Sequence, residues 1–558
     1  MKQRLHDLLR VQAERRPEAV AAVFQDVSVN YGALEQMSNR LARALQDAGC
    51  VKGDRIALLL PKSTRALAAM FGSLKADCIY VPIDTTSPII RIERILQKCE
   101  CRCILAERST AAVLNELVQH GAVSDTVFVG WMDEGDAVSS GARSRFVWSG
   151  VESMPDQPPD SISYPCDAAH ILFTSGSTGI PKGVVITHAN VIHFIRWAGV
   201  YFKMSSEDRN SGHPPLHFDL STFDIYGTVA AGAQIHLMAP ETSLLPHKLA
   251  DFIREKELTQ WFSVPWVLQQ MAKFDVVRQN DFPSLKRLLW CGEKFPTPAL
   301  IYWMKRLPHV TFDNLYGPTE ATIASSYYRV ARNPEDETAE VPVGLPCKGE
   351  LMLVLDEQLR PVRPGEPGDL YIGGVGLSPG YWNDPERTRE VFRPNPYSSN
   401  PSDRIYNTGD LARIGADGLI YLIGRSDSQF KSRGYRIELG EIEAAVHANP
   451  GVQDAAVVVI DAEASEDKTI CCAYVSRPGL DLAPLTLKRQ LTTTLPRYMM
   501  PQRWMALEEM PRNGNGKTDR PLLRQQFEQE TSGARRRPGG EAQSTRTELR
   551  SNSSTLVQ

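Results

Sequence analysis

Apolar residues in the first half of the chain alternate between strand-like runs and helical spacing. Residues 54–60 (DRIALLL) form a short apolar run that predicts a buried strand. Residues 64–75 carry apolar side chains at helical spacing, and residues 78–82 predict the next strand. Strands and helices that alternate in this way favour layered α/β structure with largely parallel sheets.

The pattern changes twice further along the chain. Between about residues 131 and 167 it gives way to Gly, Ser, Asp and Pro, which predicts a surface excursion, and it then resumes to about Gly424. Residues 427–434 (DSQFKSRG) are polar and lack apolar periodicity, as expected of a hinge between two units. A smaller α+β pattern follows, with a helix from Glu441, strands at 455–460 and 469–475, and a helix from Leu485.

Composition and charge exclude several classes of protein. The 558 residues include 62 Lys and Arg against 66 Asp and Glu, so the net charge of −4 gives no field that would recruit nucleic acid or anionic membrane. The N-terminal segment lacks the apolar core of a signal peptide, and no apolar run approaches the ~18–20 residues that span a bilayer. We therefore expect a cytoplasmic protein.

Ten cysteines are scattered along the chain. Cys99, Cys101 and Cys103 occupy alternate positions (KCECRCIL), which fits a β-strand better than a metal site, because no His or Cys pair lies nearby at zinc spacing. We expect the cysteines to be reduced thiols in a reducing compartment.

The segment 174–183 (TSGSTGIPKG) is the most informative motif. Apolar runs at 171–173 and 184–186 flank it, so it predicts a strand–loop–strand unit. Small residues let backbone N–H groups turn inward as an anion-binding nest, while hydroxyl side chains and Lys182 add donors and positive charge. The loop suits a polyphosphate. It differs from the phosphate loop of phosphoryl-transfer ATPases, because proline precedes the lysine and a strand follows.

Four further motifs follow in order: NLYGPT at 314–319 with Glu320 next, YNTGD at 406–410, GRSDSQFKSRGYRIE at 424–438 and NGKTDR at 515–520. Each is weak alone, and Asp410 or Lys517 taken singly would be read as a solvated surface residue. The ordered set resembles the adenylate-forming superfamily, specifically the amino-acid adenylation domains of nonribosomal peptide synthesis, over about residues 5–528.

The resemblance implies how the chain is divided. We expect an α/β fold whose large N-terminal domain, residues 1–425, consists of layered α/β subdomains with mostly parallel sheets and a β-barrel-like part. A small α+β lid domain, residues 426–528, would be joined to it by a hinge at Asp427. Residues 529–558 are rich in Ser, Thr, Gly and Arg, and we expect them to form a disordered tail.

The resemblance also implies an ATP site. The 174–182 loop would hold the β- and γ-phosphates, Asn314 would read the adenine, Tyr316 would stack on its ring, and Asp410 would bind the ribose. The full expected set is Thr174, Ser175, Gly176, Ser177, Thr178, Gly179, Lys182, Gly292, Glu293, Asn314, Leu315, Tyr316, Gly317, Thr319, Asp410, Tyr421, Arg425 and Lys517.

Catalysis by such a site depends on neutralising charge, since a carboxylate must attack the α-phosphate of ATP. The expected catalytic residues are Lys182, Thr319, Glu320 and Lys517, and Glu320 is the expected Mg²⁺ ligand. By resemblance, Lys517 would bridge the substrate carboxylate and the α-phosphate. It would then withdraw as the lid rotates about Asp427, and residues 431–434 would approach so that a thiol can attack the adenylate.

The amino-acid pocket is implied by the motif HFDLSTFDIYG at 217–227. Asp219 would pair with the ammonium group of an α-amino acid; the alternative is a helix or turn cap. The full expected pocket is Asp219, Leu220, Phe223, Phe262, Leu289, Cys291, Leu315, Ile323 and Ala324, with Lys517 last. Apart from Asp219 and Lys517 it carries no charge, so we expect a small apolar side chain on the substrate.

This pocket is similar to that of free-standing proline activators, whose usual pattern is Asp-Leu-Phe-Tyr-Leu-Ala-Leu-Val-Cys-Lys. The chain departs from the pattern at Phe262, Cys291, Ile323 and Ala324. The residues at these four positions conserve the polarity of the pocket and alter its shape. Proline is therefore the leading candidate, although a pocket of this kind separates neighbours that differ by one methylene by only ~1–3 kcal/mol.

We therefore expect ATP-dependent activation of a small apolar amino acid, with L-proline as the lead. The product would pass as aminoacyl-AMP to the phosphopantetheine thiol of a separate carrier protein in secondary-metabolite biosynthesis, because no carrier-attachment motif follows Arg520. We expect ATP and Mg²⁺ as cofactors and a monomer that binds neither nucleic acid nor membrane.

Two alternatives stay open. One is a D-alanine–carrier protein ligase or an acyl-CoA synthetase, because the HFDLS context is compatible with D-alanine and coenzyme A carries the same pantetheine arm. The other is a catalytically silent nucleotide-binding scaffold, against which the intact Lys182, Glu320, Asp410 and Lys517 argue.

Overall fold

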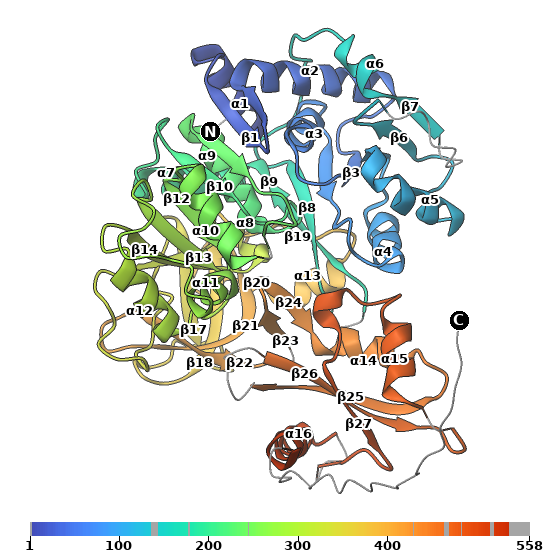
Figure 1. Cartoon of the computed structure of the whole chain (residues 1–558), viewed down its shortest axis with the longest axis vertical. Helices are drawn as coiled ribbons and strands as arrows, with labels where there is room; N and C mark the ends of the chain where they lie inside the picture. Colours follow the sequence, from blue (N-terminus) through green and yellow to red (C-terminus); the bar gives the residue numbers. More distant parts are fainter. Residues whose placement is uncertain are drawn as a thin grey trace, which may run out of the picture. The chain divides into compact units, whose positions relative to one another are not determined.

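The computed structural model describes residues 3–134, 143–176, 179–243, 245–427, 429–461, 468–480, 482–513 and 518–534 (Figure 1). The chain divides into two compact units. The larger contains residues 1–449 and 485–500, and the smaller contains residues 450–484 and 501–558.

Two mixed sheets form the framework of the larger unit. The nine-stranded sheet has the order β16-β15-β14-β13-β12-β10-β11-β1-β2, and its neighbours from β14 to β1 pair in parallel. Its strands are β1 (Val20–Phe24), β2 (Val27–Asn30), β10 (Arg209–Gly212), β11 (Gln234–Leu237), β12 (Gln260–Ser263), β13 (Arg287–Cys291), β14 (Thr311–Tyr316), β15 (Ser326–Arg329) and β16 (Leu345–Pro346).

The eight-stranded sheet has the order β19-β9-β8-β4-β3-β5-β6-β7, and it is parallel except where β9 joins β8 and β19. Its strands are β3 (Arg55–Leu59), β4 (Ile79–Pro82), β5 (Cys103–Ala106), β6 (Phe128–Trp131), β7 (Arg143–Phe146), β8 (Ala168–Thr174), β9 (Lys182–Thr187) and β19 (Gly380–Tyr381). The predicted strand–loop–strand unit around residues 174–183 is confirmed as the β8–β9 pair.

Helices cover both faces of each sheet, because the strands are apolar on both sides. In β13, Leu289 and Cys291 face one core, and Leu288 and Trp290 face another. The shared core between the sheets contains α1 (Leu5–Arg15), α2 (Tyr31–Asp47), α3 (Thr64–Lys75) and α7 (His188–Tyr201). The outer layers are α4 (Ile89–Cys99) with α5 (Ala111–Gln119), and α10 (Pro246–Glu255), α11 (Pro265–Lys273) and α12 (Thr297–Arg306) (Figure 1). The predicted layered α/β architecture is confirmed.

A five-stranded antiparallel sheet and a hairpin complete the strands of the larger unit. The sheet contains β17 (Glu350–Leu355), β18 (Gly368–Gly374), β20 (Phe392–Pro394), β21 (Arg404–Ile414) and β22 (Ile420–Arg425), and the hairpin contains β23 (Gln429–Ser432) and β24 (Tyr435–Glu438). The remaining helical elements are η1 (Arg108–Thr110), α6 (Trp148–Glu152), α8 (Asp219–Thr222), the π-helix η2 (Phe223–Gly227), α9 (Thr228–Ala231), η3 (Thr319–Ala321), α13 (Pro385–Val391), α14 (Leu439–His447), α15 (Pro484–Leu491) and η4 (Arg497–Met499).

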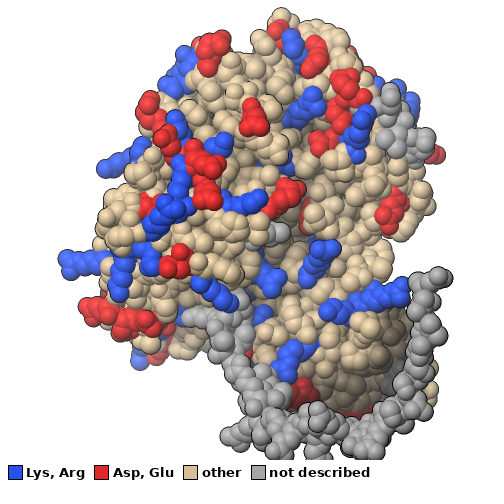
Figure 2. All heavy atoms as spheres, in the orientation of Figure 1, with Lys and Arg blue, Asp and Glu red and all other residues tan. Residues whose placement is uncertain are grey.

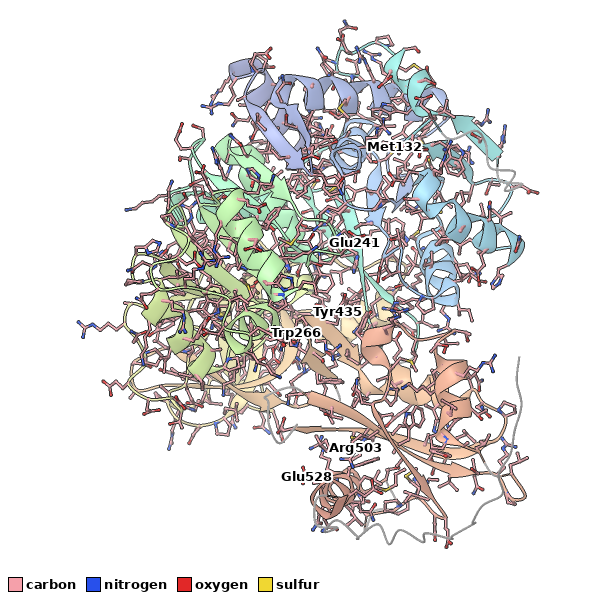
Figure 3. The ribbon with its side chains drawn as sticks, in the orientation of Figure 1. Met132, Glu241, Trp266, Tyr435, Arg503 and Glu528 are labelled. Atoms are coloured by element: carbon pink, nitrogen blue, oxygen red, sulfur yellow. The ribbon has the colours of Figure 1, made fainter. Side chains whose placement is uncertain are left out.

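The smaller unit is α+β, as predicted for the end of the chain. Its sheet contains β25 (Val452–Asp461), β26 (Lys468–Ser476) and β27 (Arg503–Leu507), and α16 (Arg520–Ala534) packs on β25. Arg503 and Glu528, labelled in Figure 3, belong to β27 and α16. Leu523 and Phe527 of α16 are buried against the sheet.

Two local predictions were wrong. Cys99 is the last residue of α4 and not part of a strand; Glu100 adopts φ 51° and turns the chain, so that β5 begins only at Cys103. The expected surface excursion after Trp131 contains β7 and α6, and Trp148 and Val151 of α6 are buried. The hinge expected in the polar segment 427–434 stays a prediction; the segment contains β23, which pairs with β24.

Candidate active site

The glycine-rich loop between β8 and β9 has the tight geometry expected of an anion-binding turn. A Cβ atom on Gly176 would lie 2.1 Å from the carbonyl oxygen of Ile180, so only glycine fits there. Gly179 adopts φ 76° and closes the turn by donating its N–H to the Gly176 oxygen. The Thr174 hydroxyl is buried and has no hydrogen-bond partner among the described residues. Ser177 and Thr178 lie outside the described residues.

Carboxylates from the hairpin and α14 contact this loop. The Lys182 Nζ lies 3.1 Å from Oε1 of Glu438, and both side chains are buried. The N–H of Gly176 donates to Oε2 of Glu441 over 3.3 Å. The loop therefore holds two internal anions at the positions where a polyphosphate is expected.

The guanidinium group of Arg436 contacts Glu320, the expected metal ligand. Glu320 in η3 is fully buried, and its two oxygens accept hydrogen bonds of 3.0 and 2.8 Å from one Arg436 nitrogen. The hydroxyl of Tyr381 donates to the same carboxylate. Burial alone would raise the pKa of Glu320, but Arg436 and Lys182 hold it at about 2, so this carboxylate stays charged.

Backbone strain marks the segment that follows Glu320. Thr322 and Ile323 both adopt positive φ, 58° and 70°, which is costly for β-branched residues. Both residues are buried.

Hydrogen bonds link three of the residues that are expected to bind the nucleotide, Tyr316, Asp410 and Arg425. The Tyr316 hydroxyl donates to Oδ2 of Asp410 over 2.5 Å, and Arg425 donates to Oδ1 over 2.6 Å. Arg425 also pairs with Asp427, the expected hinge residue, over 2.7 Å. Asn314 donates instead to the Pro342 carbonyl, and Tyr421 donates to Asp417 at the surface.

Asp219 lies at the wall of the same site, in the first turn of α8. Its carboxylate accepts a hydrogen bond of 2.8 Å from the Thr319 hydroxyl. Burial raises the pKa of Asp219 to about 6, against the opposing effects of this hydrogen bond and of the nearby Lys431. A partly desolvated carboxylate of this kind favours a cationic partner.

The eight apolar residues of the expected amino-acid pocket lie together. All of them belong to the core between the two large sheets and are almost completely buried: Leu220, Phe223, Phe262, Leu289, Cys291, Leu315, Ile323 and Ala324. The rings of Phe223 and Phe262 pack edge to face with centroids 5.7 Å apart. Of the eight, Leu220 and Cys291 line the cavity described next.

One cavity of about 110 Å³ brings many of these residues together. The predicted residues that line it are Thr174, Ser175, Asp219, Leu220, Cys291, Gly292, Gly317, Thr319, Asp410 and Arg425. Glu320 pairs with Arg436, which also lines it, and Lys182 pairs with Glu438 of the same hairpin. Lys517 lies outside the described residues.

Sequence reasoning missed several residues of the site. Arg91, His217, Tyr435, Arg436 and Tyr498 all line the cavity. The hairpin also positions Gly434, whose N–H donates to Glu293 over 2.8 Å, and Arg433, which lies over the ring of Trp266 in α11. Figure 3 labels Tyr435 and Trp266 at this meeting of hairpin and helix. The alternating charges of the motif YRIE were the only sequence signal for Arg436 and Glu438.

On the face drawn in Figure 2, the charged side chains of the described residues do not gather by sign. Lys and Arg are interspersed with Asp and Glu over the visible face (Figure 2). None of the helices in the described part of the chain combines the length and apolar character of a membrane-spanning segment. Among the described residues, no three His, Cys, Asp or Glu side chains are grouped as a metal site.

Family models match most of the chain. The model of the AMP-binding enzyme matches residues 9–382, and that of the AMP-binding enzyme C-terminal domain matches residues 441–517. The chain belongs to the AMP-binding enzyme family.

Relatives within the AMP-binding family are similar over nearly the whole chain. An L-proline–[L-prolyl-carrier protein] ligase of Pseudomonas fluorescens is 33% identical over 94% of this chain and 99% of its own length. A dimodular nonribosomal peptide synthase of Bacillus subtilis is 35% identical over 93% of this chain, which spans only 21% of that protein. The Vibrio cholerae adenylation domain AlmE, solved with glycyl-adenosine-5′-phosphate, has the same fold, with a TM-score of 0.82, 24% identity and coverage of 94% and 98%.

Proposed function

We propose that this protein activates a small apolar amino acid with ATP and transfers it to the thiol of a separate carrier protein. L-proline is the first candidate. The observation that carries the proposal is the position of Asp219, a partly desolvated carboxylate at the mouth of a closed apolar core and in the same cavity as the glycine-rich loop and Asp410. The similarity to a proline–carrier protein ligase supports it.

The residues of the chain have separate roles in this proposal. Asp219 binds the ammonium group of the substrate, and the apolar core limits the size of the substrate's side chain. Lys182 and the backbone N–H groups of its loop bind the phosphates, and Asp410 with Tyr316 orients the nucleoside. Lys517 bridges the two reacting anions, so that the carboxylate can approach the α-phosphate. Aminoacyl-AMP and pyrophosphate are the products of this step.

Glu320 is a suitable ligand for magnesium. It is a fully buried carboxylate whose oxygens already engage a cation, the Arg436 guanidinium, and carboxylate oxygen is the donor that Mg²⁺ prefers. When bound, magnesium would supply positive charge that offsets the charge of the phosphates. Arg436 and Glu438 must leave Glu320 and Lys182 before these residues can bind metal and phosphate.

Pyrophosphate exchange tests the proposal. Incorporation of labelled pyrophosphate into ATP, measured with each of the twenty amino acids and with D-alanine, should depend on L-proline or another small apolar amino acid. Exchange with none of them would contradict the proposal. Exchange with D-alanine alone, or equally fast product formation with free coenzyme A, would favour the alternative ligases.

The raised pKa of Asp219 predicts how substrate binding depends on pH. The ammonium group is bound only by the ionised carboxylate, whose pKa in the free protein is about 6. KM for the amino acid should therefore be constant above about pH 7 and rise as pH falls through 6, by about tenfold for each unit below it. KM for ATP measured in parallel is the control. A KM for the amino acid that stays constant down to pH 5 would contradict the prediction.

A further inference from the structure

His217 lies in the cavity wall beside the carboxylate of Asp84, and neither residue belongs to the expected ATP or amino-acid residues. His217 lines the cavity two residues before Asp219 and is separated from it by Phe218, whose backbone is extended at φ −100° and ψ 139°. The His217 Nε2 lies 4.0 Å from Oδ2 of Asp84, and the imidazole keeps 21% of its surface exposed. The ring is therefore partly accessible where it lines the cavity, and its Nε2 lies near a carboxylate.

Asp84 is fixed by the turn that follows β4. Its carboxylate accepts hydrogen bonds from the N–H and the hydroxyl of Thr86 and from the hydroxyl of Ser87, over 3.0, 2.7 and 3.0 Å. Burial would raise the pKa of Asp84, but His217 and these hydrogen bonds lower it below its ordinary value. Asp84 is therefore a fixed negative charge beside the imidazole.

Besides Asp84, the charged groups that shift the pKa of His217 are the cations Arg91 and Lys62. Arg91 of α4 lines the same cavity and pairs with Glu441 of α14, while Lys62 is buried and donates to the carbonyls of Gly212 and His213. Tyr435 of β24 and Tyr498 of η4 stack with centroids 3.7 Å apart.

Burial lowers the pKa of His217; Asp84 opposes this shift, and Arg91 and Lys62 add to it. The imidazole is accordingly neutral at pH 7. The carboxylate favours the proton on Nε2, which leaves the lone pair of Nδ1 to accept a proton.

We propose that His217 is the general base of thiol transfer and that Asp84 is its positioning residue. This inference rests on the proposed function. Nδ1 of His217 takes the proton of the pantetheine S–H group as sulfur attacks the carbonyl carbon of the aminoacyl-AMP. The C–S bond forms, the bond from that carbon to the phosphate oxygen breaks, AMP leaves as an anion, and the imidazolium is stabilised by Asp84. The aromatic side chains of Phe218, Tyr435 and Tyr498 line the same cavity.

The test separates proton removal from all earlier steps. Synthetic prolyl-AMP is supplied to the full chain with either free pantetheine or hydroxylamine, since hydroxylamine attacks as a neutral nucleophile and needs no prior deprotonation. In His217→Gln, the ratio of the pantetheine rate to the hydroxylamine rate should fall roughly 10²-fold at pH 7. In wild type the pantetheine rate should be nearly constant from pH 7 to 8, whereas in His217→Gln it should rise about tenfold per pH unit toward the thiol pKa.

Two further variants and a control complete the design. Imidazole added to His217→Ala should restore part of the pantetheine rate. Asp84→Asn should lower that rate and shift its acidic limb to lower pH, because the imidazolium loses its stabilising charge. His236→Gln, a buried histidine of β11 that does not line the cavity, should leave the ratio unchanged.

An unchanged ratio and an unchanged pH profile in His217→Gln would overturn the inference. Loss of both reactions together would show that His217 has a structural role, and it would overturn the inference as well. Pyrophosphate exchange by wild type with L-proline tests the proposed function separately, so the two proposals can fail independently.

Discussion

Asp219→Asn should lower kcat/KM for L-proline in pyrophosphate exchange by roughly 10²–10³-fold. The substitution keeps the shape of the side chain and removes the charge that the substrate ammonium requires. Removal of one partner of a buried ion pair costs about 3–5 kcal/mol, and each 1.4 kcal/mol is about a factor of ten. The hydrogen bond from Thr319 can be kept by the amide oxygen, so the loss reports the ammonium contact and not a collapse of the wall.

A substrate without the ammonium group is the control for this prediction. Tetrahydrofuran-2-carboxylate has the ring of proline and an ether oxygen in place of the amine. Wild type should use it poorly, and Asp219→Asn should use it at least as well as wild type does. An equal loss for both substrates would show that Asp219 acts on the structure of the site instead of on the amine.

Glu320→Gln should lower the rate of pyrophosphate exchange by roughly 10²–10³-fold, the usual cost of removing one group that stabilises transition-state charge. The apparent Kd for Mg²⁺, read from the metal dependence of exchange, should rise. The substitution also leaves the largely buried Arg436 guanidinium without the carboxylate that pairs with it, so the free energy of unfolding should fall. Exchange measured against Mg²⁺ concentration, with thermal unfolding of the same samples, checks both effects.

A second ion pair with a buried carboxylate gives the control for Glu320→Gln. Asp281 pairs with Arg254 over 2.6 Å, is also buried, and does not line the cavity. Asp281→Asn should lower stability and leave the Mg²⁺ dependence of exchange unchanged. If Glu320→Gln keeps wild-type Mg²⁺ dependence, Glu320 is not the metal ligand.

Much of the architecture follows from local patterns in the sequence. The strand at 54–60 and the helix at 64–75 correspond to β3 and α3, because apolar periodicity there coincides with burial on one or both faces. The loop at 174–183 was recognisable because its function needs glycines, hydroxyls and a lysine within ten residues. The apolar pocket residues are distant in sequence yet share one core, because three adjacent parallel strands and the start of η2 supply most of them.

The internal ion pairs of the site, Lys182 with Glu438 and Arg436 with Glu320, could not be predicted from local sequence patterns. Lys182 and Glu438 are 256 residues apart, and their pairing depends on the register of β23 against β24. A polar segment without periodicity carries no signal for such a register. For the same reason Arg436 was overlooked, since only its distance to Glu320 in three dimensions shows that it stands where a metal is expected.

The central claim is that the glycine-rich loop, Asp410 and Asp219 serve one substrate complex. A crystal structure with a non-hydrolysable prolyl-adenylate analogue, such as the prolyl sulfamate of adenosine, tests it most directly. The account predicts the proline nitrogen within hydrogen-bond distance of Asp219 and the ribose hydroxyls on Asp410, with Arg436 no longer bound to Glu320. An analogue bound in another cavity, or one whose amine makes no contact with Asp219, would contradict it.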